Sequence, residues 1–186
     1  MKILAFAASN SENSINKRLA NYTAHLIADA EVELLDINDF EMPIYSIQRE
    51  VHLGKPKQAQ NFYNKIAEAD AIVISFAEHN GSYTAAYKNL FDWTSRIDIK
   101  VYQDKPIIML ATSPGPGGAS SVLASASGSA SYFAADVKGI LSVPNFFDNF
   151  DIETNKIKNE EINTALLTLV EKLTLSLKSL QPLSSL

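Results

Sequence analysis

Hydroxyl and amide side chains are concentrated near the start of the chain, in residues 8–16. This segment, here called the Ser/Asn turn, contains the residues Ser9, Asn10, Ser11, Asn13, Ser14 and Asn16. It follows a short apolar run and precedes an amphipathic segment, so it is predicted to connect a strand to the start of a helix. The free N–H groups and the dipole at a helix start favour an anion, and neutral Ser and Asn donors can surround phosphate oxygens. Simple helix capping is the alternative, but a cap needs only one such residue.

The overall composition excludes several other kinds of site. The chain has 186 residues, a net charge of -5 and no cysteine. The absence of cysteine excludes disulfides and thiolate chemistry. The negative net charge argues against a basic surface for nucleic acid. The three histidines, His25, His52 and His79, are too far apart in sequence to suggest a metal site. The start of the chain does not look like a signal peptide, and no apolar run approaches the roughly 18–20 residues that span a bilayer. We therefore expect one cytoplasmic domain over residues 1–186, with no nucleic-acid or membrane partner.

Five short apolar runs position the Ser/Asn turn within a predicted fold. They are expected to be strands over residues 2–8, 32–37, 71–76, 106–112 and 137–143. The third and fourth runs are almost continuously apolar, as is typical of parallel strands covered on both faces. Helical periodicity separates the runs, so the order alternates between strand and helix. This alternation predicts an α/β fold with a doubly wound, five-stranded parallel sheet of flavodoxin-like order 2-1-3-4-5.

The helices between the strands are predicted from apolar residues at helical spacing. The stripes are Ile15, Leu19, Tyr22 and Leu26; Phe62, Ile66 and Ala69; Ala86, Leu90, Trp93 and Ile97; and Ile162, Leu166, Leu169, Leu173 and Leu177. A further helix over residues 119–136 consists mainly of Ala and Ser. It could form a subunit interface or pack closely on the sheet, and the sequence leaves both open. Residues 181–186 are expected to be frayed.

Two more loops are predicted at the carboxyl edge of the sheet, where ligands bind in such folds. The loop after the third strand runs from Ala77 to Tyr83, and its Asn80-Gly81 pair predicts a tight turn. We expect Ser82 to cap the helix that follows. The loop after the fourth strand contains three glycines, at positions 115, 117 and 118. Each loop could be an ordinary connector, but their shared location favours a binding site.

Other chemistries on this fold have no support in the sequence. There is no Gly-x-Ser-x-Gly elbow, no Gly-x4-Gly-Lys-Ser/Thr loop and no Gly-x-Gly-x-x-Gly after the first strand. Asp36 and Asp39 are expected to end a strand and cap a turn. Lys88 and Asp92, four residues apart on one helix, are expected to form a structural ion pair.

With these loops in view, residues 1 to about 145 resemble the NAD(P)H-dependent FMN reductase family. The family's first motif, Gly-Ser-x-Arg-x-x-Ser-x-Asn, is similar to the Ser/Asn turn. Its second, Pro-Glu-Tyr-Asn-x-Ser, is similar to the segment 77–82. The Leu-Lys-Asn triplet and the Asp-Trp pair that follow in the family are similar to 87–89 and 92–93. Its Leu-Pro-x-Tyr is similar to 42–45.

The resemblance implies a site for FMN. Ser9, Ser11, Ser14 and Asn16 would hold the phosphate, and Glu78, His79, Asn80 and Gly81 would flank the ring. Ile15 and Ala77 would belong to the same cofactor site, and Ser113, Gly115, Gly117 and Gly118 would close its other side. The chain departs from the family pattern at Ser11, where an Arg is usual. The phosphate would then depend on neutral donors, with Lys17 or Arg18 nearby, and FMN would bind more weakly. His79 and Ala77 also replace the usual Tyr and Pro.

The implied activity is transfer of hydride from NADPH or NADH through FMN to a small acceptor such as a flavin or a quinone. The resemblance also implies a homodimer or homotetramer, built on the helices after strands three and four. A flavodoxin-type electron carrier is the alternative, and a hydrolase or non-redox binding module is a third possibility. Replacing Ser14 and Asn16 with Ala is expected to weaken FMN binding without harming the fold, because both residues are expected to lie on a solvent-facing turn.

Overall fold

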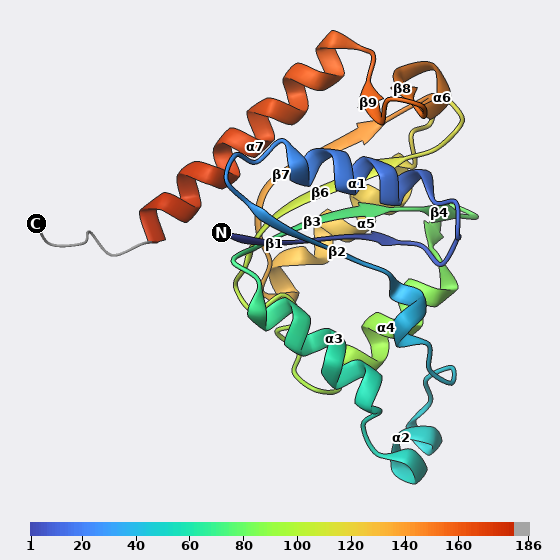
Figure 1. Cartoon of the computed structure of the whole chain (residues 1–186). Helices are drawn as coiled ribbons and strands as arrows, with labels where there is room; N and C mark the ends of the chain where they lie inside the picture. Colours follow the sequence, from blue (N-terminus) through green and yellow to red (C-terminus); the bar gives the residue numbers. More distant parts are fainter. Residues whose placement is uncertain (181–186) are drawn as a thin grey trace, which may run out of the picture.

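The computed structural model describes residues 1–180, and they form a parallel sheet between two layers of helices (Figure 1). The sheet consists of β1 (Lys2–Ala8), β2 (Glu31–Leu35), β3 (Ala71–Phe76), β6 (Pro106–Thr112) and β7 (Asp136–Val143). Its order is β2-β1-β3-β6-β7 and every pairing is parallel. This confirms the predicted flavodoxin-like order. The expected fraying of residues 181–186 lies outside the described residues.

Alternate side chains of the central strands supply two separate cores. On one face, Leu4 and Phe6 of β1 join a cluster formed with α3 (Lys57–Glu68), α4 (Ala85–Ser95) and α5 (Ser120–Ser129). On the other face, Ile3 and Ala5 pack with α1 (Ile15–His25) and α7 (Glu160–Leu180). Figure 1 shows α1 and α7 on one side of the sheet and α3 and α4 on the other. Burial on both faces explains why β3 and β6 are almost continuously apolar.

The remaining elements are short. They are η1 (Ile37–Phe40), α2 (Ile47–Leu53), β4 (Glu78–His79), β5 (Ser82–Tyr83), η2 (Ala130–Phe133), α6 (Phe146–Asn149), β8 (Phe150–Asp151) and β9 (Lys156–Ile157). The pairs β4–β5 and β8–β9 are antiparallel hairpins. Within residues 1–180, no helix is long and apolar enough to cross a bilayer.

Two predicted boundaries were wrong. β2 ends at Leu35 because the Asp36 side chain accepts a hydrogen bond from the Asn38 backbone N–H and begins the turn η1. Asp36 therefore caps a turn, as expected. The helix predicted over 119–136 is shorter in the structure, because α5 ends at Ser129. The tighter 3-10 helix η2 follows it and ends at Phe133. Ala134 then adopts a left-handed conformation, which stops the helix and leads into β7.

Candidate functional site

Three loops meet at the carboxyl edge of the sheet and border an open hollow of about 280 Å³, here called the edge hollow. It is lined by Ser9, Ser11, Asn13, Ser14, Ile15, Asn16, Ala77, Glu78, His79, Thr112, Ser113 and Pro114. Nine of these twelve residues belong to the predicted site. The ends of β1, β3 and β6 bring them together, because neighbouring parallel strands end at the same edge.

Five predicted residues do not line the edge hollow. Asn80 and Gly81 form the tip of the β4–β5 hairpin, and both have positive φ angles, of 52° and 76°. That backbone is the tight hairpin turn that an Asn-Gly pair favours. Gly115, Gly117 and Gly118 lie further along the loop after β6, beyond the residues that face the hollow.

Gly118 has a packing role in that loop. Its φ is +58°, and a Cβ at this position would lie 2.3 Å from the Ser142 hydroxyl oxygen. That hydroxyl donates a hydrogen bond of 2.8 Å to the Gly118 carbonyl oxygen. The loop is held further by Asn145 and Phe146, whose N–H groups donate to the carbonyls of Gly115 and Ser113. The glycine-rich loop is therefore fixed against the segment that follows β7.

Ser14 caps α1. Its hydroxyl oxygen accepts a hydrogen bond of 3.1 Å from the Lys17 N–H. The next residues, Ile15 and Asn16, also line the edge hollow, and N–H groups in the first turn have no carbonyl partner within their own helix. The cap therefore accounts for one donor at the helix start and leaves others for an anion. Capping and anion binding are compatible at this position.

Asn16 is an internal structural residue, contrary to the expectation that it faces solvent. It is 3% exposed, and Ser14 is only 6% exposed. The Asn16 side-chain nitrogen donates to the Thr112 carbonyl at 3.1 Å, and its oxygen accepts from the Thr112 N–H at 3.0 Å. The same oxygen accepts from the Ser75 hydroxyl at 2.7 Å. Asn16 thus joins the start of α1 to the ends of β3 and β6, so replacing it must affect the fold.

The two basic residues expected near the phosphate are engaged elsewhere. The Lys17 ammonium lies 2.6 Å from the Asp36 carboxylate, and Arg18 donates to the Asn155 side chain at 2.7 Å. Burial raises the pKa of Asp36, but Lys17 and the Asn38 N–H outweigh this and hold it below its ordinary value. None of the described residues lining the edge hollow is Lys or Arg. Anion affinity in this hollow would depend on neutral donors.

The β4–β5 hairpin follows β3 in the sequence and forms one wall of the edge hollow. The Glu78 carboxylate accepts a hydrogen bond of 2.9 Å from the Val122 N–H in the first turn of α5, which fixes this side chain. The prediction that Ser82 caps the following helix was wrong, because Ser82 pairs with His79 in the hairpin. Thr84 is the cap: its side-chain oxygen accepts from the Tyr87 N–H at 3.2 Å and donates to the Ala8 carbonyl at 3.1 Å.

Three lining residues were missed by the sequence analysis, namely Asn13, Thr112 and Pro114. Asn13 lies within the Ser/Asn turn and could have been included with its neighbours. Thr112 is the last residue of β6, so its position at the strand end was a usable signal. Pro114 follows in the same loop. Each therefore belongs to a segment that had already been predicted to reach the sheet edge.

Some residues that carry the family resemblance have structural roles. Asn89 accepts from the Tyr45 N–H at 2.8 Å and donates to the Met42 carbonyl at 3.0 Å. The Trp93 indole donates to the Pro43 carbonyl at 2.7 Å. The segments 42–45 and 89–93 therefore hold the loop after η1 against α4.

The Lys88–Asp92 ion pair is confirmed. The Lys88 ammonium lies 2.7 and 2.8 Å from the two Asp92 carboxylate oxygens. Both residues are on α4, one turn apart, as their spacing predicted.

The sheet order and a polar hollow at its switch point define a flavodoxin-like α/β protein. Residues 1–148 match the family model described as NADPH-dependent FMN reductase, and the chain belongs to this family.

Characterised relatives and solved structures are consistent with this membership. An NADPH:quinone oxidoreductase of Arabidopsis thaliana is 30% identical over 122 residues, which cover 63% of this chain and 61% of the relative. A 2-hydroxy-1,4-benzoquinone reductase of a Burkholderia species is 33% identical over 120 residues, 63% of each chain. The match thus spans about three fifths of the length of these relatives. The structure of the flavoenzyme FerB, an NAD(P)H:(acceptor) oxidoreductase from Paracoccus denitrificans, is similar in fold, with a TM-score of 0.74 and 21% identity over 96% of this chain and 97% of that one.

Proposed function

We propose that the protein is an FMN-dependent NAD(P)H oxidoreductase that reduces a small acceptor, such as a free flavin or a quinone. The observation that carries this proposal is the edge hollow, because it gathers nine of the predicted FMN-site residues in a chain of the FMN reductase family. NADPH or NADH would be the donor.

The residues present fit FMN. The start of α1 offers N–H groups to a phosphate, and Ser9 and Ser11 in the preceding turn offer hydroxyls. Ala77 to His79 on one side, and Ser113 with Pro114 on the other, offer backbone edges to a flat ring. The volume of about 280 Å³ lies just under the range of about 300–1,000 Å³ typical of pockets for drug-sized ligands. Part of FMN would therefore remain outside the hollow.

FMN, when bound, supplies the hydride chemistry, and the protein supplies binding, orientation and hydrogen bonds. Ser9, Ser11 and the helix start would fix the phosphate end, while the β4–β5 hairpin would set the position of the ring. Glu78 is engaged by the Val122 N–H, so it acts as a rigid part of the wall. This assignment requires no acid–base triad among the lining residues.

The direct test is titration of the purified chain with FMN, followed by anaerobic NADPH or NADH. We expect FMN to bind and its visible absorbance to bleach when the donor is added. Absence of both binding and bleaching would refute the proposal. Binding of FMN without oxidation of either nicotinamide would indicate a flavodoxin-type electron carrier instead.

We also propose that the protein forms a homodimer through α4 and α5, or a homotetramer that includes this contact. The exposed residues of α5 include Ser121, Ala124 and Ser125, whose small side chains would allow a second helix to approach closely. Sedimentation equilibrium would test this, and a monomer at all concentrations would contradict it. A cytoplasmic location also remains a prediction, which cell fractionation would test.

The Ser11→Arg substitution is expected to tighten FMN binding about five- to tenfold. Ser11 is exposed at the rim of the edge hollow, where the family usually has Arg. A hydrogen bond to a charged group stabilises by about 1 kcal/mol more than a neutral one. Quenching of flavin fluorescence measures the dissociation constant. Riboflavin, which lacks the phosphate, serves as the control ligand, and an equal gain for riboflavin and FMN would contradict the assignment.

A further inference from the structure

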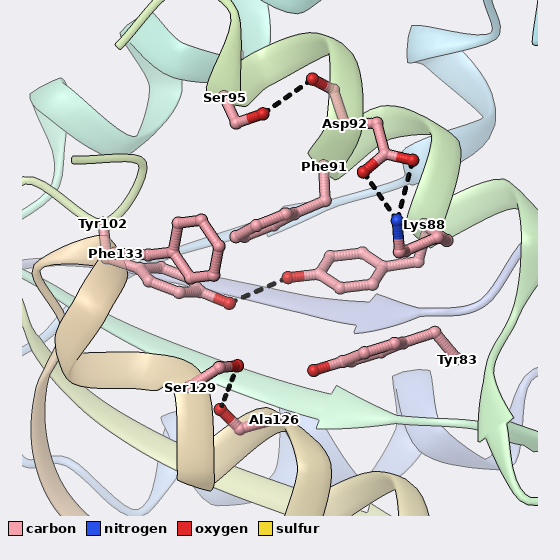
Figure 2. Close-up of a pocket in the computed structure, with 10 residues that line it drawn as sticks. Tyr83, Lys88, Phe91, Asp92, Ser95, Tyr102, Ala126, Ser129 and Phe133 are labelled. Atoms are coloured by element: carbon pink, nitrogen blue, oxygen red, sulfur yellow. Dashed lines mark hydrogen bonds and ion pairs between the residues drawn. The ribbon is translucent and has the colours of Figure 1, made fainter. Parts of the chain in front are cut away.

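A second hollow, of about 220 Å³, lies in the helical layer formed by α4, α5 and η2 (Figure 2). Five aromatic side chains line it: Tyr83, Tyr87, Phe91, Tyr102 and Phe133. We call it the aromatic hollow. It shares no lining residue with the edge hollow, and it lies between the two helices on which the homodimer is proposed.

The rings of the aromatic hollow contact one another as a continuous set. Phe91 and Phe133 meet edge to face, with centroids 4.7 Å apart and planes at 90°. Tyr87 lies 5.8 Å from both Tyr83 and Phe91, and Phe91 lies 5.7 Å from Tyr102. These are favourable separations for aromatic pairs. These rings therefore already form an apolar surface on which a flat ligand can pack.

Two buried hydroxyls in its wall have one hydrogen bond between them. Tyr87 and Tyr102 are 2% and 4% exposed, and their hydroxyl oxygens are 2.9 Å apart. One hydroxyl donates to the other, which leaves the proton of the accepting hydroxyl without an acceptor among residues 1–180. Burial raises the pKa of both groups, so both protons are retained. The wall therefore contains a buried donor that a ligand oxygen could satisfy.

The rim of the aromatic hollow carries no free charge among the described residues. Lys88 and Asp92 are the charged residues that line it, and they are paired with each other at 2.7 and 2.8 Å. Ser95, Ser129 and Ala126 complete the lining. A neutral ligand suits this arrangement better than an ion. The volume also limits the ligand, since an apolar cavity of about 150 Å³ accommodates benzene.

We propose that the aromatic hollow binds a neutral, flat aromatic molecule of one or two fused rings that carries a carbonyl oxygen. The rings would pack among the five aromatic side chains, and the carbonyl oxygen would accept the spare tyrosine proton. This site is distinct from the FMN site, and the inference does not rest on the proposed redox function.

Chromone, a bicyclic ketone, is the probe, and naphthalene is the matched compound without a carbonyl. Binding is measured on the full chain by changes in its NMR spectrum, with and without FMN. We expect saturable binding of chromone under both conditions, about three- to tenfold tighter than that of naphthalene, as one neutral hydrogen bond provides. In the double variant Tyr87→Phe with Tyr102→Phe, this preference is expected to disappear.

A second variant tests the location without removing a buried hydroxyl. Ser129→Leu places a larger side chain in the lining and is expected to weaken chromone binding at least tenfold. Ser179→Leu makes the same change on an exposed residue of α7, on the other face of the sheet and outside the lining, and is expected to have no effect. Absence of saturable chromone binding, or equal effects of the two Leu variants, would overturn the proposal. It would also be overturned if chromone did not bind and Ser129→Leu dissociated an oligomer, because a second copy would then fill the hollow.

Discussion

Replacing Asn16 with Ala is expected to lower the free energy of unfolding by about 3–5 kcal/mol. The substitution removes three hydrogen bonds and leaves the Thr112 N–H, the Thr112 carbonyl and the Ser75 hydroxyl without this partner. Each buried polar group left unsatisfied costs about 1–3 kcal/mol. The loss should also loosen the edge hollow, because Asn16 holds the start of α1 against β3 and β6.

Urea unfolding followed by circular dichroism measures this loss. Asn13→Ala is the matched control, since Asn13 belongs to the same turn but is exposed. We expect the control to stay within about 0.5 kcal/mol of the parent protein, as is usual for surface substitutions. A loss below about 1 kcal/mol for Asn16→Ala would show that water replaces the three bonds and that this residue is not structurally important.

The fold was predictable because its central strands are buried on both faces. β3 and β6 therefore appear in the sequence as almost continuous apolar runs, and the helices between the strands show clear apolar stripes. The boundaries were less predictable, because single side chains set them. Asp36 ends β2 through a local hydrogen bond, and the left-handed Ala134 ends the helical segment after α5.

The location of the candidate site was also predictable, since the carboxyl ends of parallel strands form one edge. The internal role of Asn16 was not, because its partners lie 59 and 96 positions away in sequence. The same applies to Lys17, whose charge is paired with Asp36 rather than left for a phosphate. Residue types at a loop predicted which segments meet, but only the folded arrangement shows which side chains remain free for a ligand.

Replacing Ser14 with Asp is expected to weaken FMN binding at least 100-fold while the protein remains as stable as before. Asp is as good a helix cap as Ser, and a negative charge at a helix start interacts favourably with the dipole. The cap that Ser14 now makes to the Lys17 N–H would therefore persist. A phosphate at the same helix start would meet a like charge. At about 4 Å and an effective dielectric constant of about 20, one pair of charges repels by about 4 kcal/mol.

Two controls separate capping from phosphate binding in this experiment. Ser14→Asn is an equally good cap without a charge, so FMN affinity should change little. Riboflavin should bind Ser14→Asp as well as it binds the parent protein, because it carries no phosphate to be repelled. Flavin fluorescence measures the affinities, and urea unfolding checks the stability of each variant. If Ser14→Asp bound FMN undiminished, the phosphate could not lie at the start of α1, and the Ser/Asn turn would be only a helix cap.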